Sequence, residues 1–417
     1  MISLISIIIY FIFLLSIYFA VFWLTVLLQK GIGDEEKELK GSPMITVAIP
    51  AYNEESTIGR TIKSVINLDY PKDKLEIIIV DDGSKDNTAN IAKKIIAKNN
   101  KLDISLIMQK NAGKGSALNA AIKKAKGEFF ICIDADSMVR EDALKKMLPE
   151  FNDPDVAIVL PLMKIKNPKN MLEKIQWYEY LINFFYKKLM AKLDCVHVSP
   201  GPFSMYRKKV LKELGEFDEN NLTEDLEIAM RTQKHNYKIV QLLSTEVYTY
   251  APTNLVAFYK QRRRWYKGTI FNLVKYRKLI FNPKYGDLGI LHLPTVMLSG
   301  AIILTIIFVT AYNYVLKPLY YKIHDLSFVN YDYLFFINKW AANFQVIDIN
   351  VVNIFFGIVT FILGITIIIL ANKYAQERTF RYGVMLMPIY LIFYGILMFG
   401  VWFGVLIEFI TGRKQRW

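Results

Sequence analysis

The chain has 417 residues, of which 53% are hydrophobic, with a formal net charge of +14 and a mean hydropathy of +0.23. This length allows two domains, and the mean hydropathy is high for a purely soluble protein. The two cysteines, Cys132 and Cys195, lack C-x-x-C spacing, which argues against a zinc site or a disulfide framework.

Long apolar segments flank a more polar centre. Residues 3–28 carry no charge, and as a helix they would be roughly 39 Å long, enough to cross a bilayer. A signal peptide is the competing interpretation, but there is no basic n-region or small-residue cleavage site and the apolar stretch is too long. Further spans are expected at 289–315, 351–371 and 383–410. The predicted divisions are an N-terminal membrane helix (1–30), a cytosolic domain (31–253), an interfacial segment (254–286) and a C-terminal membrane region (287–417).

The positive charge has two possible partners, nucleic acid or an anionic membrane surface. Basic residues crowd near the predicted membrane borders, in 186–192, 259–267 and 275–278. This distribution favours the cytoplasmic face of a cell membrane, with lipids and not nucleic acid as partner.

The polar centre alternates strand and helix patterns. Strands are expected at 45–52, 75–84, 103–109 and 128–133, and helices at 55–68, 85–98 and 114–127. The fourth strand contains the near-continuous apolar run 129–133, which is typical of a strand covered on both faces. The alternation predicts an α/β fold with a mostly parallel sheet and helices on both faces.

Polar clusters follow three of these strands, at the carboxyl edge where such sheets bind ligands. They are Tyr52-Asn53-Glu54, Asp81-Asp82 and the pair Asp134 and Asp136. Each alone could be a turn or a helix N-cap. Capping needs only one carboxylate, however, and two that repel each other need a cation, a proton or water. A divalent cation prefers such hard oxygen ligands and would leave positions open for a diphosphate.

Six motifs occur in a specific order: VAIPAYNEESTIGRTIKSVI, IIIVDDGSKDNT, NAGKGSALNAA, FFICIDADSMV, GEFDENNLTEDLEIAMR and QRRRW. Together, over about residues 44–270, they resemble family-2 inverting nucleotide-sugar glycosyltransferases. Within that family the chain looks most like membrane-embedded synthases of β-linked polymers, namely cellulose, chitin, hyaluronan and poly-N-acetylglucosamine. The resemblance implies a GT-A-like nucleotide-sugar-binding domain with Mg²⁺ or Mn²⁺ as cofactor.

The resemblance also implies residue roles. For the UDP-sugar donor it implies contacts from Pro50, Tyr52, Glu54, Asp81, Asp82, Lys114, Asp134, Gln261 and Arg264, with the metal on Asp136 and Asp134. For catalysis it implies Asp225 as general base, with Glu224 and Arg264, and for the acceptor it implies Trp265, Phe203 and Ser204. The chemistry agrees, because inversion needs a base for the acceptor hydroxyl and cations for the departing UDP.

Other interpretations of these motifs stay open. In QRRRW, Arg262 and Arg263 are expected to bind lipid headgroups while Arg264 and Trp265 face inward. Thr223 is expected to cap the helix that begins at Glu224. Segments 171–193 and 254–276 have the pattern of amphipathic interfacial helices, although an ordinary buried helix is the alternative for the first.

Four spans with a cytosolic catalytic domain would put the basic C-terminus outside, against the positive-inside rule; a re-entrant last segment is the alternative. Polar residues within the spans, His292, Asn313 and Glu408, should face protein or water. The leading functional prediction is a synthase that adds sugars from a UDP-sugar to a growing β-glycan. The runner-up transfers one sugar to a lipid, such as a polyprenyl phosphate or glycolipid. A D-x-D phosphohydrolase or a channel would leave Asp82, Asp225 and the Q-x-x-R-W motif unexplained.

Overall fold

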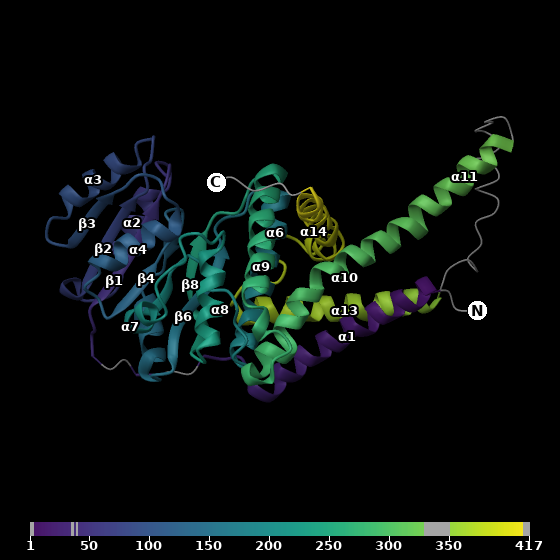
Figure 1. The fold of residues 1–417 in the computed structure, drawn as a ribbon, viewed down its shortest axis with the longest axis horizontal. Coiled ribbons are helices and arrows are strands. Elements are labelled where there is room, and N and C mark those ends of the chain that lie inside the picture. Colours follow the sequence, from purple (N-terminus) through teal and green to yellow (C-terminus); the bar gives the residue numbers. More distant parts are fainter. Residues whose placement is uncertain (1–3, 35–36, 39–40, 329–350, 412–417) are drawn as a thin grey trace.

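The computed structural model describes residues 4–34, 37–38, 41–328 and 351–411 (Figure 1). The strands are β1 Ile45–Ala51, β2 Leu75–Asp81, β3 Asp103–Met108, β4 Phe129–Cys132, β5 Met138–Val139, β6 Val156–Ile165, β7 Ser204–Arg207 and β8 Lys238–Thr249. The helices are α1 Leu4–Lys30, α2 Ile58–Ile66, α3 Thr88–Lys98, α4 Lys114–Lys124, α5 Ala143–Met147, α6 Met171–Ala191, α7 Lys208–Glu213, α8 Glu224–Lys234, α9 Leu255–Lys275, α10 Leu293–Ala311, α11 Lys317–Phe328, α13 Val351–Tyr374 and α14 Leu386–Ile410. The four strands and three helices expected between 45 and 133 are confirmed.

All eight strands form one sheet in the order β3-β2-β1-β4-β7-β6-β8-β5. The first four strands are parallel, as predicted, with Ile45 of β1 opposite Leu75 of β2 and Phe129 of β4. Strand β7 then runs antiparallel to both β4 and β6, β6 is parallel to β8, and β5 is antiparallel to β8. The sheet is therefore parallel in its first half and mixed in its second.

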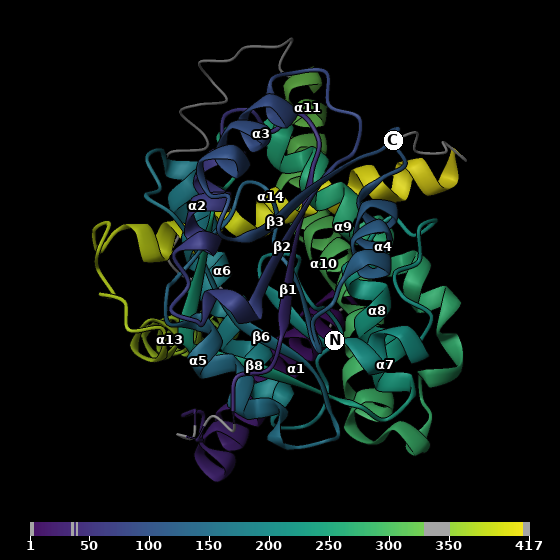
Figure 2. The same ribbon diagram turned by 90° about the vertical axis from the view of Figure 1, so that its left-hand side faces the viewer.

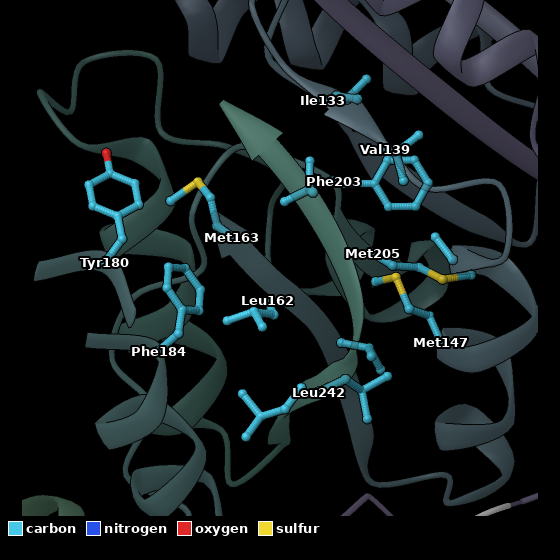
Figure 3. Close-up of a cluster of buried hydrophobic side chains, with 14 of the residues drawn as sticks. Ile133, Val139, Met147, Leu162, Met163, Tyr180, Phe184, Phe203, Met205 and Leu242 are labelled. Atoms are coloured by element: carbon cyan, nitrogen blue, oxygen red, sulfur yellow. The ribbon is translucent and has the colours of Figure 1, made fainter. Parts of the chain in front are cut away.

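Side chains of each strand alternate between two buried layers, because successive residues point to opposite faces. In β1, Val47 and Ile49 pack with α2, whereas Ala48 packs with α4 on the other face. The first layer continues to the far end of the sheet, where β6 and β8 contact α6 (Figure 3). There Leu162 and Leu242 pack with Phe184 of α6. Helix α6 thereby joins the sheet to the apolar helices.

Within the described part of the chain, four helices are long and apolar enough to cross a membrane: Ile7–Lys30, Leu288–Thr305, Val351–Tyr374 and Leu386–Ile410. Of these, α1 and α13 lie side by side and extend away from the sheet with α10 (Figure 1). Helix α14 differs, because it is seen end-on in Figure 1 and runs across the view in Figure 2. It therefore lies roughly perpendicular to the other three.

Contacts at the two ends of α14 agree with this orientation. Near its start, the ring of Tyr390 lies 5.8 Å from that of Tyr178 on α6. Near its end, Glu408 pairs with Arg263 of α9 at 2.6 Å. A helix of 25 residues is about 37 Å long. Over this length, the two ends of α14 contact α6 and α9, respectively, the helices that border the sheet.

The connection between α13 and α14 also contacts the catalytic domain. Lys164 of β6 donates to the carbonyl of Ala375 at 2.7 Å and pairs with Glu377 at 3.1 Å. The hydroxyl of Tyr178 donates to the carbonyl of Thr379 at 2.8 Å. The C-terminal end of α13 therefore lies next to the sheet.

Helices were expected at 171–193 and 254–276, and α6 and α9 confirm them. Helix α6 begins with a full capping box, in which Asn170 accepts from the amide of Glu173 and Glu173 accepts in return from the amide of Asn170. It lies between the sheet and α13, so one face is buried against each. Helix α6 is therefore a buried, packed helix, and it also lies at the border between the sheet and the apolar helices.

Candidate active site

Two loops at the carboxyl edge of the sheet hold each other in place. Asn53, at a positive φ of 56°, accepts from the amide of Lys85, and its own amide donates to Ser84. Gly83 has a φ of 77°, and a Cβ there would lie 2.8 Å from the amide nitrogen of Asn111. Glycine is therefore required after Asp82, so that the third loop can approach.

The two aspartates at the end of β2, Asp81 and Asp82, are buried and differ in their partners. Both carboxylate oxygens of Asp82 accept hydrogen bonds, from Gln109 and from the amides of Ala112 and Gly113, at 2.8–2.9 Å. Asp82 therefore shapes the loop that leads into α4. Asp81 has one buried carboxylate oxygen with no hydrogen-bond partner in the described part of the chain.

Lys114, the first residue of α4, connects the two halves of the site. Its ammonium pairs with Asp134 at 2.5 Å and with Glu224 of α8 at 3.3 Å. Gly201 allows this arrangement, since a Cβ there would lie 2.6 Å from a carboxylate oxygen of Asp134. Although burial opposes it, the charges of Asp134 and Glu224 raise the pKa of Lys114 well above its usual value, so the lysine is a cation.

Asp136 lies in an environment that disfavours its charged form. Burial, with the nearby charges of Asp134 and Glu54, raises the pKa of Asp136 to about 6, although Ser137 donates to it at 2.9 Å. Among the described residues no three His, Cys, Asp or Glu side chains cluster as a metal site. The donor set fits a hard divalent cation held by one or two carboxylates that takes its other ligands from a diphosphate.

Asp225 lies in the first turn of α8, and its backbone is held firmly. Its carbonyl accepts from both the amide and the hydroxyl of Ser199, at 3.2 and 2.8 Å. Burial, with the adjacent charge of Glu224, raises the pKa of Asp225 to about 6, while the charges of Lys114 and Arg264 oppose this rise. A carboxyl with a pKa near neutrality suits a general base.

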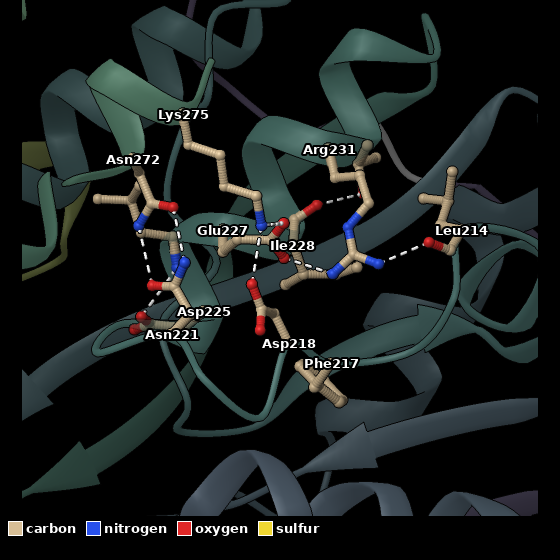
Figure 4. A network of polar contacts seen from close by, with 12 residues as sticks. Leu214, Phe217, Asp218, Asn221, Asp225, Glu227, Ile228, Arg231, Asn272 and Lys275 are labelled. Carbon is tan, nitrogen blue, oxygen red and sulfur yellow. Dashed lines mark hydrogen bonds and ion pairs between the residues drawn. The ribbon is translucent and has the colours of Figure 1, made fainter.

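Thr223 occupies the N-cap position of α8, but the prediction that its side chain caps the helix is wrong. It makes no side-chain capping bond, and its hydroxyl instead accepts from Asn272 of α9 at 3.1 Å. Figure 4 shows the network that continues this contact, in which Lys275 of α9 donates to Asp218 and to Glu227 at 2.8 Å. Helix α9 is thereby joined to α8, the helix that carries the candidate base Asp225.

The expectation that Arg262 and Arg263 bind lipid headgroups is contradicted. Arg262 is only 1% exposed, pairs with Glu179 of α6 at 2.6 Å, and places its guanidinium 4.1 Å from the ring centre of Trp265. Arg263 pairs with Glu408 of α14. Because Arg262 is enclosed by protein and paired with a buried carboxylate, it is not available to a lipid headgroup.

Polar residues expected to face protein within the apolar helices do so in two cases. Glu408 pairs with Arg263 and also with Lys267, at 2.7 Å. His292 lies 2.7 Å from His197, measured between ring nitrogens. Asn313 instead donates to the carbonyl of Val309 within its own helix.

The predicted acceptor contacts Phe203 and Ser204 are not supported. Phe203 is fully buried and belongs to the hydrophobic core around β6 (Figure 3), and the hydroxyl of Ser204 donates to the carbonyl of Pro200. Phe203 also has a positive φ of 59°, which is uncommon for a residue other than glycine. Trp265, partly exposed beside Arg262, remains as the predicted acceptor residue.

Other predicted donor residues have mixed placements. Tyr52 is 43% exposed, whereas Pro50 is buried within β1. Burial, aided by the charges of Asp134 and Asp86, raises the pKa of Glu54, which places it beside the D-x-D carboxylates. Gln261 accepts from Arg262 at 2.5 Å.

Three residues near the site were missed from the sequence. Glu179 supports Arg262, Gly201 admits the Lys114–Asp134 pair, and Lys187 of α6 has a pKa that burial lowers to about 7 and that the charge of Asp225 raises. The sequence signal for Glu179 was its position between the aromatic residues Tyr178 and Tyr180 of α6. Its partner is 83 positions away, so no local pattern could identify the pair.

Parts of this chain are similar to known proteins. Residues 46–215 match the model of Glycosyl transferase family 2. Over this segment the chain is therefore similar to family-2 glycosyltransferases. The matched segment contains the D-x-D aspartates but ends before Asp225 and Trp265.

Two curated relatives are poly-β-1,6-N-acetyl-D-glucosamine synthases. That of Staphylococcus aureus strain COL is 35% identical over 234 residues, which are 55% of this chain and 55% of that protein. That of Staphylococcus epidermidis is 32% identical over 237 residues, 56% of each. The chain thus matches about half the length of these relatives.

The fold is also found in a solved structure. A mannosyltransferase of Pyrobaculum calidifontis, in complex with GDP-Man and Mn²⁺, has a TM-score of 0.60 with 20% sequence identity, over 89% of this chain and 96% of that one. This likeness confirms the expected GT-A-like fold.

Proposed function

We propose that this protein is a membrane-embedded inverting glycosyltransferase that transfers a sugar from a UDP-sugar to a growing β-linked polysaccharide. The observation that carries the proposal is the position of Lys114. It pairs with Asp134 on the donor side and with Glu224, which precedes Asp225. Donor carboxylates and candidate base therefore belong to one site.

The residues would act as follows. Ionised Asp225 accepts the proton of the attacking acceptor hydroxyl. Arg264 and Lys114, whose charges both act on Asp225, supply positive charge for the departing UDP. Trp265 offers its ring to the acceptor sugar while Arg262 covers one side of it.

Asp136, with Asp134, would hold Mg²⁺ or Mn²⁺. The raised pKa of Asp136 supports this assignment, because a cation would restore its usual acidity. When bound, the ion would neutralise charge on the diphosphate and so assist its departure. Lys114 already holds Asp134, which leaves Asp136 as the freer ligand.

N-acetylglucosamine is the first sugar to test, because the two staphylococcal relatives are named for its polymer. Purified protein would be incubated with UDP-N-acetylglucosamine, UDP-glucose or GDP-mannose, and released nucleotide and product mass would be measured. We expect a ladder of many units from one UDP-sugar, with nucleotide release far above the amount of enzyme. Lipid carrying a single sugar, even at high donor concentration, would instead select the lipid-transferase alternative.

We also propose that α1, α10 and α13 cross the membrane while α14 lies along its catalytic-domain side. Support comes from the two ends of α14, which contact α6 and α9. The basic residues Arg413, Lys414 and Arg416, which lie outside the described part of the chain, would then stay on the cytosolic side, as the positive-inside rule favours.

This topology predicts the labelling of single cysteines by an impermeant maleimide. In intact cells Thr411→Cys should resist labelling like Lys94→Cys in the catalytic domain, whereas Tyr320→Cys in α11 should react. Reaction of Thr411→Cys in intact cells would show that α14 crosses.

A further inference from the structure

Arg262 is a charged side chain that the protein encloses almost completely, so neither donor nor acceptor can reach it. Its Nη2 donates to Glu179 of α6 at 2.6 Å, and its Nη1 donates to Gln261 at 2.5 Å. Glu179 is itself only 3% exposed, so the carboxylate and the guanidinium form an ion pair inside the protein. Any effect of this ion pair on the reaction must therefore pass through neighbouring residues.

Aromatic rings surround the guanidinium of Arg262. Its central carbon lies 4.1, 4.9 and 6.0 Å from the ring centres of Trp265, Phe258 and Tyr180, respectively. Phe258 and Tyr180 are buried, whereas Trp265 is partly exposed. Cation–π attraction is strongest for tryptophan and increases when the cation is desolvated. The guanidinium therefore covers one face of the Trp265 ring, and the remainder of the ring is left for an acceptor sugar.

Helix α6 fixes α9 at two separate places. Two amide side chains of α6 donate at 2.9 Å to backbone carbonyls just before α9, Asn170 to Thr253 and Gln176 to Pro252. Glu179 lies three positions after Gln176, on the same face of α6, and reaches Arg262 two turns into α9. Because α6 packs on β6 and β8, the ring of Trp265 is tied to the sheet at whose edge the predicted donor residues lie.

Stability alone does not account for this ion pair, because apolar side chains of similar volume often stabilise a protein as well as a buried ion pair does. What the pair adds is direction. The guanidinium is planar, and Glu179 and Gln261 hold two of its nitrogens, so its plane has one orientation. A ring stacked on that plane is oriented as well. A flexible methionine would fill the same space without fixing the ring.

We propose that Glu179 and Arg262 are positioning residues that hold the ring of Trp265 in the orientation in which it receives the acceptor sugar. This inference rests on the proposed function, in which Trp265 contacts the acceptor. Glu179 fixes the guanidinium and the guanidinium fixes the ring, although neither residue touches the substrate. Without them the ring would turn about its side-chain bonds, and the acceptor hydroxyl would lie less often within reach of Asp225.

The test replaces both members of the pair together, because Glu179→Gln alone leaves a buried cation without its partner. Glu179→Leu/Arg262→Met leaves no unpaired charge and keeps a similar volume, so we expect a folded protein. Arg262→Lys is a second variant, which keeps the charge beside Glu179 but removes the planar group over the ring. Asp34→Asn/Lys188→Met is the matched control, because it removes another buried ion pair of α6 about 14 Å further along the helix.

The environment of the ring is measured first, and this measurement needs no substrate. Fluorine NMR of protein labelled with 5-fluorotryptophan gives a resonance for Trp265, assigned by its loss in Trp265→Leu. In Glu179→Leu/Arg262→Met and in Arg262→Lys this resonance should shift, whereas that of Trp23 on α1, assigned in the same way, should stay in place. The matched control should leave the Trp265 resonance unchanged. An unchanged Trp265 resonance in the pair variant overturns the proposal, whether or not the protein transfers sugar.

Transfer is then measured with a β-1,6-linked oligomer of N-acetylglucosamine as acceptor and saturating UDP-N-acetylglucosamine as donor. Because misplacement of about 1 Å can cost a hundredfold in rate, kcat/KM for the oligomer should fall about 10- to 100-fold in Glu179→Leu/Arg262→Met, with the KM of the donor unchanged. In a Trp265→Leu background the same replacement should cost little more, because the ring through which it acts is gone. Equal losses in the two backgrounds would show a general structural role and refute positioning.

Binding of the same oligomer in the presence of saturating UDP separates this inference from the proposed function, because no sugar is transferred. Weaker binding in the pair variant, with normal binding in the matched control, supports the positioning role even where the wild type transfers no sugar. Equal binding in the wild type and the pair variant refutes it. Absence of oligomer binding in the wild type also refutes it, since Trp265 would then not receive an acceptor sugar.

Discussion

Replacing Asp225 by asparagine should abolish transfer and at the same time stabilise the protein at neutral pH. Asparagine keeps the acceptor oxygen for the amide of Leu226 but cannot take a proton or carry a charge. Loss of a general base lowers the rate by about two to four orders of magnitude. Binding of UDP should change little, because the nucleotide contacts are predicted on other elements.

The gain in stability follows from the raised pKa of Asp225. Its value rises from 3.8 to about 6 in the folded protein, so folding favours the protonated form. The cost of ionising it is absent below about pH 4, grows between pH 4 and 6, and is complete above pH 6. Two pKa units correspond to about 3 kcal/mol, and partial exposure to water reduces this to about 1–3 kcal/mol.

Thermal unfolding of the purified variant at pH 7.5 and pH 4 measures this effect. Asp225→Asn should melt a few degrees above the wild type at pH 7.5, with the difference vanishing at pH 4. Asp218→Asn is the control of opposite sign: although burial opposes it, the hydrogen bond from Lys275 lowers the pKa of Asp218. A variant of Asp225 that is less stable at neutral pH, or that turns over normally, would refute the reasoning.

Two further perturbations test other parts of the site. Asp136→Ala should lose activity and metal-dependent UDP binding, as chelation by EDTA should in the wild type; normal turnover after EDTA treatment would exclude a required cation. Glu179→Gln should leave Arg262 without its buried partner and destabilise the protein by about 3–5 kcal/mol, measured by unfolding. Glu213→Gln on α7, which lacks such a pair, should lie within about 0.5 kcal/mol of the wild type.

Local pattern was enough to predict the parallel half of the sheet. Each of the first four strands is a short apolar run between turn residues, and each helix between them repeats apolar residues at helical spacing. The antiparallel additions could not be predicted in this way. Strand β5 has only two residues, and β7 pairs with β4 across more than 70 positions, so its place depends on distant partners.

Sequence reasoning identified candidate site residues whose side-chain type and position after a strand indicate a role. It missed residues whose environment is made by a partner far away in the sequence. Asp134 and Asp136 follow a buried strand, so their edge location follows from the sheet. Arg262 was misassigned because its environment is made by Glu179 on another helix. Phe203 lies in the hydrophobic core at a positive φ, a backbone conformation that its residue type does not predict.

The three successive arginines of α9 illustrate how one helix serves several partners. Successive residues of a helix point about 100° apart, so neighbours cannot share one environment. Arg262 faces α6, and Arg263 shares a carboxylate of α14 with Lys267, four positions later. Arg264 lies one turn before Gly268, where a Cβ would collide with the side chain of Thr223, two residues before the candidate base Asp225. The charged run therefore contacts the predicted acceptor residue Trp265, helix α14 and the start of the helix that carries the candidate base, and a shift of α9 would disturb all three together.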